Sequence, residues 1–197
     1  MADVYKFRVN LCDFEDIIWR DIEITSISSV AKLGYSVLAS FESLANHLFN
    51  IRYNDDLYEI VFDDDAFEDE AVIDPIETKL SDLKLSVGDI LMMVYDYGAG
   101  WEFEIELLSI TPMKKGAHAH YPYIVDGKGR GIIEDTSPCE LAEIVENTDK
   151  NEIIPEIWDV YLMKMIKWDY RLFDLEYSNM IFKKDVRRIQ HAYEKML

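Results

Sequence analysis

The first part of the chain alternates apolar and polar residues with the period of two that is typical of half-buried β-strands. This pattern covers residues 5–11, and the β-branched run at 17–24 should pair back on it as the second strand of a hairpin. In that second strand Arg20 falls on the same face as Ile18, Ile22 and Ile24. Either Arg20 is drawn onto the inner face of the sheet, or a bulge near Trp19 resets the register.

One helix and two more hairpins are predicted between residues 28 and 110. Ser28 or Ser29 can cap the helix, and its apolar stripe consists of Val30, Leu33, Val37, Phe41, Leu44 and Leu48. The hairpins are expected at 47–62 and at 90–110, where two glycines between the strands suit a tight turn. Residues 63–74 indicate an acidic loop, and 111–135 a mostly irregular segment.

Helical periodicity dominates the rest of the chain. Thr136 or Ser137 can cap a helix with Pro138 at its first position. A second helix is predicted to begin at Pro155, and a last one over residues 174–196, where an apolar seam should pack on the protein's own core. Hairpins, one early helix and then more helices predict an α+β fold with antiparallel sheets.

The charge divides the chain into two regions. The 197 residues have a formal net charge of −19, and residues 1–147 carry 30 acidic and 11 basic side chains, whereas 148–197 carry nine of each. We therefore expect an acidic α+β domain over 1–147 with a helical extension over 148–197 packed on it, or a single domain overall. An acidic surface of this size favours a basic protein or a small ligand as partner, and argues against direct nucleic-acid binding.

Composition excludes several protein classes. Hydrophobic residues make up 49% of the chain, which argues against intrinsic disorder. No apolar run approaches the roughly 18 residues of a membrane span, and the first residues do not resemble a signal peptide, so a cytoplasmic protein without membrane contact is expected. The two cysteines, Cys12 and Cys139, lack the spacing of a disulfide scaffold or a cysteine-rich zinc site.

Several motifs resemble those of the plasmid pRiA ORF-3-like family. They are Ile18-Trp19-Arg20, His47-Leu48, Gly88-Asp89, Tyr95-Asp96-Tyr97-Gly98-Ala99-Gly100-Trp101 and Phe173-Asp174-Leu175-Glu176-Tyr177-Ser178-Asn179. The family motif has a second aspartate where this chain has Ala99, and of a Pro-Pro-Glu-Asp-Cys-Gly-Gly motif only Glu134-Asp135 remain. Both departures put any shared chemistry in doubt.

The resemblance implies a family without an established activity, whose members recur near mobile elements and are in some cases labelled resolvase-like. The residues give that label no support. The chain has seven arginines, none of them clustered around a candidate nucleophilic serine, and its most acidic region lies where a DNA-binding face would be needed.

The hairpin turn at residues 95–101 is the first candidate site. Asp96 could act as a ligand or base beside an aromatic wall of Tyr95, Tyr97 and Trp101. The alternative is that Asp96 caps the turn while Trp101 fills the core, which is common turn chemistry. Arg20 could bind an anion here, although a structural ion pair with Asp96 or Glu134 is the favoured expectation.

A divalent metal site is the second candidate. His118 and His120 would point the same way on an extended strand, and Asp126, Glu134 and Asp135 could complete a ligand set that activates water for hydrolysis. The pattern is weak because His-x-His alone is not specific, and exposed histidines in a solvated loop are favoured. The glycine-rich run at 127–131 lacks a phosphate-loop pattern and is interpreted as a flexible turn.

Three functional hypotheses follow. The leading one is a non-enzymatic binding module that presents an acidic face to a basic partner or small ligand, with no cofactor evident. The second is a metal-dependent hydrolase that uses the His/Asp/Glu residues named above. The third is an acidic mimic of nucleic acid that occupies a DNA-binding protein.

Overall fold

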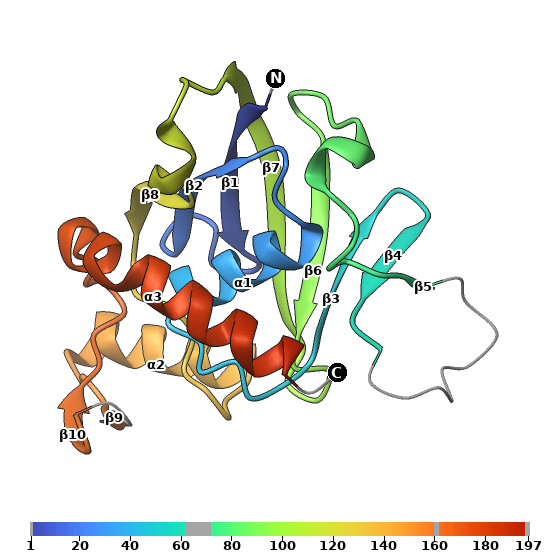
Figure 1. Cartoon of the computed structure of the whole chain (residues 1–197). Coiled ribbons are helices and arrows are strands. Elements are labelled where there is room, and N and C mark those ends of the chain that lie inside the picture. The colour runs from blue at the N-terminus through green and yellow to red at the C-terminus, as the bar shows by residue number, and fades with distance from the viewer. Residues whose placement is uncertain (1, 62–71, 160–161, 196–197) are drawn as a thin grey trace.

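The computed structural model describes residues 2–61, 72–159 and 162–195, and its centre is an eight-stranded sheet (Figure 1). Its strands in chain order are β1 (Asp3–Leu11), β2 (Trp19–Thr25), β3 (Phe49–Tyr53), β4 (Asp56–Glu59), β5 (Val72–Ile73), β6 (Ile90–Tyr95), β7 (Trp101–Pro112) and β8 (Tyr123–Lys128). Across the sheet the order is β5-β4-β3-β6-β7-β1-β2-β8, and every pair is antiparallel except β4 with β5.

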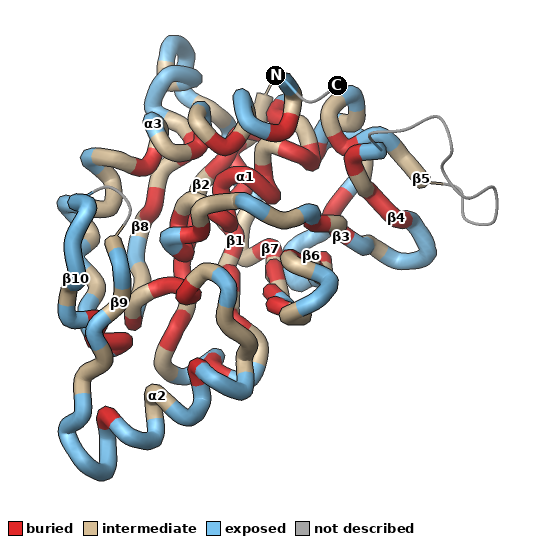
Figure 2. The backbone as a smooth tube through the Cα atoms, turned by 90° about the horizontal axis from the view of Figure 1, so that it is seen from below, coloured by how far each residue is buried: buried red, intermediate tan, exposed pale blue. Residues whose placement is uncertain are grey.

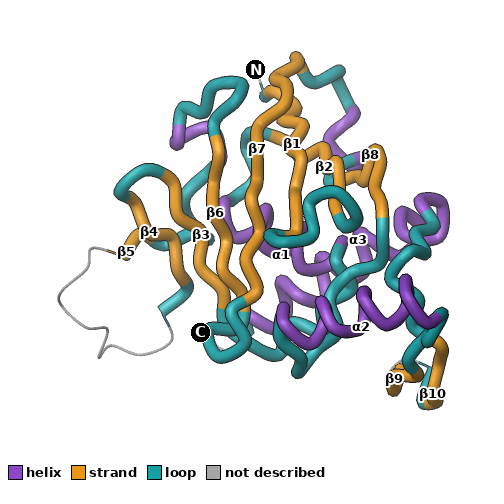
Figure 3. Tube along the Cα trace, turned by 180° about the vertical axis from the view of Figure 1, so that it is seen from behind, coloured by secondary structure: helices purple, strands orange, loops and turns teal. Residues whose placement is uncertain are grey.

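The remaining elements lie beside one face and one end of this sheet. They are α1 (Val30–Ser40), the 3-10 turns η1 (Leu80–Leu83) and η2 (Ala117–His120), α2 (Pro138–Asn151), a separate hairpin of β9 (Glu156–Asp159) and β10 (Lys164–Lys167), and α3 (Leu175–Glu194). Figure 3 shows β6, β7 and β1 from behind, with α1 and α3 on their far side. The fold is therefore α+β, as predicted. No helix within the three described ranges is long and apolar enough to cross a membrane.

The core lies between the sheet and the helices. Alternate residues of the strands, such as Phe7, Val9 and Phe103, are buried because they point at α1. Helix α1 is itself buried almost all round, because α3 covers its other side (Figure 2). Tyr35 of α1 stacks on Tyr193 of α3 with ring centroids 5.6 Å apart. The apolar seam of α3 thus packs on the protein's own core, as expected.

The predicted hairpins and helix starts are largely confirmed. Strands β1 and β2 pair as expected, and so do β3 with β4 and β6 with β7. Ser29 caps α1 by accepting from the Lys32 N–H, and Ser137 caps α2 with Pro138 at its start. Arg20 is fully buried on the inner face of β2, which selects the first of the two alternatives for that strand. The division at residue 147 stays a prediction.

Two helical predictions are wrong. Helix α1 ends at Ser40, because Glu42 and Ala45 adopt left-handed backbone conformations with φ of 61° and 60°, so residues 44 and 48 do not continue its stripe. The segment after Pro155 forms the β9–β10 hairpin instead of a helix. Its register pairs Ile157 with Ile166, and both side chains are half-buried toward the body of the protein. Apolar pairs lie on both faces of the hairpin, Ile157 with Ile166 and Trp158 with Met165, and together they recur at the spacing of a helical stripe.

The segment predicted to be irregular, 111–135, contains β8 and η2, and its glycine-rich part is not a flexible turn. A Cβ atom at Gly127 would lie 2.7 Å from the Phe173 ring, and one at Gly129 would lie 2.2 Å from the Ile17 carbonyl oxygen. Close packing requires glycine at both positions, because a side chain at 127 would displace the Phe173 ring and one at 129 would displace the backbone of Ile17.

Asn179 of α3 closes the exposed edge of β8. Its Oδ1 accepts a hydrogen bond from the Ile124 N–H at 3.0 Å, and its Nδ2 donates to the Ile124 carbonyl at 2.8 Å. The side-chain amide therefore takes the place of a neighbouring strand at this position. It prevents the edge of β8 from pairing with a strand of another protein molecule there.

We expect Asn179→Ala to lower the free energy of unfolding by about 2 kcal/mol, because both Ile124 backbone groups lose their partner. Urea denaturation of the variant measures this loss. Asn151→Ala is the matched control, since Asn151 is exposed and, within the described ranges, its side chain bonds only to Asn147 Oδ1 at 3.3 Å. Equal stability of the two variants would show that Asn179 does not hold the edge.

Candidate functional site

Three segments that are far apart in sequence meet around His47, in the loop before β3. The His47 Nε2 atom lies 3.3 Å from Asp135 Oδ1, 3.5 Å from Asp96 Oδ2 and 3.9 Å from Glu134 Oε1. Asp96 follows β6 and reaches His47 because β6 pairs with β3, which also lets the Asp96 N–H bond to the Leu48 carbonyl at 2.9 Å. We call His47, Asp96, Glu134 and Asp135 the His47 cluster.

Glu134 is the most engaged member of the cluster. Its Oε2 accepts from Ser43 Oγ at 3.1 Å and from the Leu44 N–H at 2.8 Å, and its Oε1 accepts from the Tyr95 hydroxyl. Burial first, and then the hydrogen bond to Glu134, raise the pKa of Tyr95 well above its ordinary value. Both Glu134 oxygens are therefore occupied by internal donors. The carboxylate fastens the loop that follows α1 to the sheet.

Asp96 has a turn role as well. Its φ is 55°, and its Oδ1 accepts from the Gly98 and Ala99 N–H groups at 3.1 and 3.2 Å. Trp101 is buried in the core, whereas Tyr97 is half-exposed and donates to Glu59 Oε1 at 2.7 Å. The aromatic residues of this hairpin thus have separate surroundings, and they do not form one wall beside Asp96.

Arg20 does not join the His47 cluster, and the carboxylate partner predicted for it is wrong. Its guanidinium donates to the carbonyls of Ser40, Trp19 and Lys128 at 2.8–3.0 Å, and its Cζ lies 4.0 Å from the Phe173 ring centroid. Burial lowers the pKa of Arg20 to about 10. Carbonyl oxygens and an aromatic face thus take the place of an ion pair, and Arg20 ties β2 to α1, β8 and the start of α3.

The proposed metal ligands are not brought together. His118 and His120 lie in the 3-10 turn η2 instead of on an extended strand, and the His120 ring stacks on Tyr123 at 4.7 Å. Asp126 lies on β8, where its Oδ1 accepts from the Gly127 N–H at 2.8 Å. In the part of the chain that the structure describes, no group of three or more His, Cys, Asp or Glu side chains is arranged to hold a metal ion.

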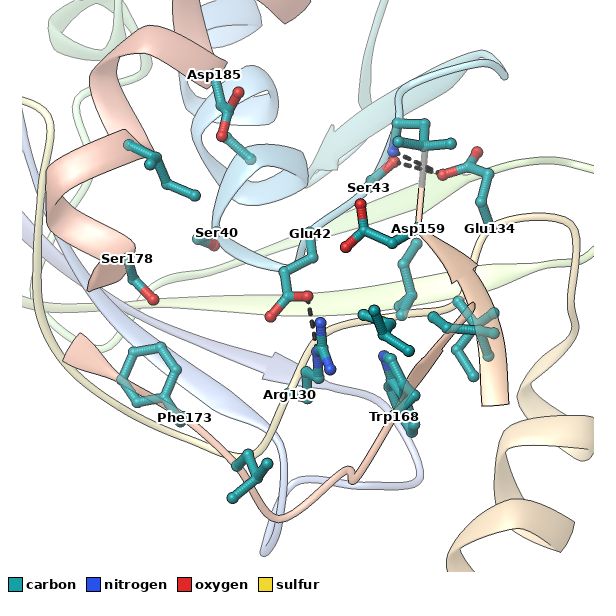
Figure 4. A pocket seen from close by; sticks show the side chains of 18 of the residues that line it. Ser40, Glu42, Ser43, Arg130, Glu134, Asp159, Trp168, Phe173, Ser178 and Asp185 are labelled. Atoms are coloured by element: carbon teal, nitrogen blue, oxygen red, sulfur yellow. Dashed lines mark hydrogen bonds and ion pairs between the residues drawn. The ribbon is translucent and has the colours of Figure 1, made fainter. Parts of the chain in front are cut away.

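A groove of about 570 Å³ opens next to Glu134, between α3 and the β9–β10 hairpin (Figure 4). Its base is formed by residues 39–44 and 130–135, and Trp168 closes it on the hairpin side. Trp158 on β9 lines it while 54% exposed, and Tyr177 of α3 lines it from the other side. The sequence did not indicate this groove, because one of its walls is the hairpin predicted to be a helix.

The groove is lined by more acidic than basic side chains. The acids are Glu42, Glu134, Asp135, Asp159, Asp174 and Asp185, and the bases are Arg130 and Arg188. Arg130 forms an ion pair with Glu42 at 2.9 Å inside the groove (Figure 4), and Arg188 donates to the Leu44 carbonyl at 3.0 Å. Both arginines are thus engaged by the protein itself. The surplus of carboxylates makes the potential in the groove negative.

Comparison with known proteins places the chain in a family. Residues 3–180 match the sequence profile described as plasmid pRiA4b ORF-3-like protein. The chain belongs to this family. Its fold is shared with the crystal structure of a protein of unknown function from Methanosarcina mazei Go1, which is 21% identical, with a TM-score of 0.72 over 89% of this chain and 96% of that chain. No curated protein matches the chain in sequence.

In this pRiA4b ORF-3-like chain the motifs separate into two spatial groups. Arg20 and Phe173 pack on each other, and Asn179 holds β8. His47, Asp96 and the Glu134-Asp135 pair instead form the His47 cluster. The first group fixes the position of α3, which is one wall of the groove, and the second fixes the loop at the base of the groove.

Proposed function

We propose that this pRiA4b ORF-3-like protein is a non-enzymatic binding module, and that the groove between α3 and β9–β10 holds a positively charged ligand with an apolar body. The observation that carries the proposal is the lining of the groove, where apolar and aromatic side chains stand beside six carboxylates and two arginines. A small organic cation or a basic side chain of a partner protein has this chemistry.

The physical argument has two parts. A cleft lined mainly by one sign of charge concentrates ions of the opposite sign, and the net charge of −19 adds to this field. Trp158 and Tyr177 are each more than half exposed along the groove, and such aromatic faces attract cations. The apolar walls favour a ligand with a hydrocarbon body, because binding removes that body from water.

The His47 cluster supports a binding role better than a catalytic one. Both oxygens of Glu134 and one of Asp96 accept hydrogen bonds from the protein itself, which holds the loop in place. His118 and His120 lie in η2 and Asp126 lies on β8, so no observation favours the hydrolase hypothesis. No observation favours the nucleic-acid-mimic hypothesis over ligand binding in the groove.

Three probes with eight carbon atoms each test the proposal: octylammonium, octanol and octanoate. We expect octylammonium to bind with the highest affinity and octanoate with the lowest, because the head group changes from positive to neutral to negative while the apolar body stays nearly the same size. Indole NMR signals are the readout. Trp158 and Trp168 line the groove and should shift, whereas Trp101 in the core and Trp19 on β2 are internal controls.

We expect Trp158→Ala to weaken octylammonium binding by about tenfold, because it removes the larger of the two exposed aromatic faces of the groove. NMR titration of the Trp168 indole signal measures the affinity. Val87→Ala is the control, since Val87 is an exposed apolar residue that does not line the groove. If octanoate binds as well as octylammonium, or if Trp158→Ala has no effect, the proposal is wrong.

A further inference from the structure

The outer face of the sheet, on the side opposite to α1 and α3, is covered by no helix of the part of the chain that the structure describes (Figure 3). On β7 it presents the carboxylates of Glu102, Glu104 and Glu106 in one row. Directly beside them on β6 lies an apolar row, because the register pairs Val94 with Glu102, Met92 with Glu104 and Ile90 with Glu106. Ile90 is 46% exposed, and the other two apolar residues are half-buried.

The neighbouring strand β1 forms no ion pair with the acidic row among the described residues, although its register places Arg8 opposite Glu106. Lys6 and Arg8 lie on β1 but are both bound by Asp21 of β2, with Lys6 Nζ 2.9 Å from its Oδ2 and Arg8 Nε 2.5 Å from its Oδ1. Among the residues that the structure describes, the Glu104 carboxylate accepts only from the amide of Asn10, at 3.2 Å. Within the described ranges, Glu102 and Glu106 form no side-chain hydrogen bond or ion pair.

The carboxylates of this face also act on the nearby thiol of Cys12. The pKa of Cys12 is raised to about 11, by burial first and then by nearby carboxylates, with Glu102 the largest of these contributions. The negative potential therefore extends over this end of the sheet, where the Cys12 N–H bonds to the Glu102 carbonyl at 3.0 Å.

We propose that this face docks an amphipathic α-helix of a partner protein, with basic residues along one flank and apolar residues along the other. Two parallel rows, one acidic and one apolar, match the two flanks of one helix, which is about 10 Å wide and covers two strands about 4.8 Å apart. An extended segment would present only a single row of side chains to the sheet.

The spacing along the strands also fits a helix. Alternate residues of β7 are about 6.8 Å apart, and helical residues at i and i+4 are about 6.0 Å apart along the axis. Lysine or arginine at i, i+4 and i+8 would therefore meet the three carboxylates nearly in register. Leucine or isoleucine on the adjacent flank would cover Ile90, Met92 and Val94, so that charge and apolar burial act together.

The test uses a fluorescein-labelled 15-residue helical peptide with lysines at i, i+4 and i+8 and leucines on the adjacent flank, and a scrambled peptide of the same composition. Fluorescence anisotropy gives the affinity, and amide NMR shifts locate the site. We expect the patterned peptide to bind at least about tenfold tighter than the scrambled one and to shift the signals of β6 and β7.

Charge-neutral variants locate the contact. Glu102→Gln combined with Glu106→Gln should weaken peptide binding by about tenfold, because two of the three carboxylate contacts are lost. Glu77→Gln combined with Glu143→Gln removes the same charge from exposed positions outside the face and should leave binding unchanged. Ile90→Ser tests the apolar row, with Val87→Ser as its exposed control.

Equal binding of the scrambled peptide, or equal weakening by the control pair, would overturn the proposal, because attraction to the overall charge would then explain the result. Shifts confined to Trp158 and Trp168 would overturn it as well, since the peptide would then occupy the groove. Octylammonium binding in the groove is independent of Glu102 and Glu106. Failure of this proposal and failure of the groove proposal are therefore distinguishable.

Discussion

Gly131→Ala is expected to destabilise the protein by about 3–5 kcal/mol. A Cβ atom at this position would lie 1.8 Å from the carbonyl oxygen of Phe41 and 2.2 Å from its carbonyl carbon. Both are backbone atoms, so no rotamer change can relieve the overlap. The segment would have to move away, which breaks the hydrogen bond from the Ile132 N–H to the Phe41 carbonyl at 2.9 Å. The two segments that form the base of the groove, 39–44 and 130–135, would separate.

Urea denaturation measures this effect, with Gly98→Ala as the matched control. A Cβ atom at Gly98 would meet only Asp96 Oδ1, at 3.4 Å, which is an ordinary contact. We therefore expect a change of about 0.5 kcal/mol or less for the control. If Gly131→Ala unfolds at the same denaturant concentration as Gly98→Ala, the backbone at Gly131 does not lie as close to Phe41 as the structure places it.

The hairpins of the main sheet could be predicted because their patterns are local. Period-two alternation at residues 5–11 and 101–110 is sufficient for the strands, and glycines in the turn at 96–100 fix the connection between β6 and β7. The helix caps Ser29 and Ser137 are local signals as well. Each of these predictions depends on fewer than about a dozen neighbouring residues, which is the range over which sequence patterns are informative.

The β9–β10 hairpin could not be predicted in this way. Ile157, Trp158, Met165 and Ile166 are spaced as they would be on one side of a helix. What selects the hairpin is tertiary: Trp168, directly after β10, is buried in the core, and the inward isoleucines close the groove. Long-range contacts of this kind override the local periodicity. The groove was missed for the same reason.

The His47 cluster was foreseen only in part. Asp96, Glu134 and Asp135 were candidates because they are acidic residues within motifs, and the structure brings them together. His47 itself marked only the start of a strand, although it lies at the centre of the cluster. Its position depends on β3 lying beside β6, and strand order is not visible in a single sequence. Arg20 was misassigned because backbone carbonyls, which have no sequence signature, bind it.

Glu134→Ala is expected to lower the free energy of unfolding by about 3 kcal/mol. The Glu134 side chain is only 8% exposed, and it accepts hydrogen bonds from Ser43, Leu44 and Tyr95. Its removal leaves these donors without a partner, at about 1–3 kcal/mol for each group that water cannot reach. The sum is reduced because the carboxylate no longer has to be desolvated.

Asp135→Ala is the matched control, since the Asp135 side chain is 78% exposed and its one described contact is with His47. We expect a change of about 1 kcal/mol or less for it in urea denaturation, because Asp135 has φ of 59° and alanine is disfavoured in this conformation. Hydrogen exchange at the Leu44 amide gives a second, local readout. Glu134→Ala should accelerate this exchange and Asp135→Ala should not, because only Glu134 accepts that N–H. If the Glu134→Ala variant is as stable as the Asp135→Ala variant and its Leu44 amide stays protected, the prediction is wrong. Contacts other than those of Glu134 would then hold residues 41–48 in place.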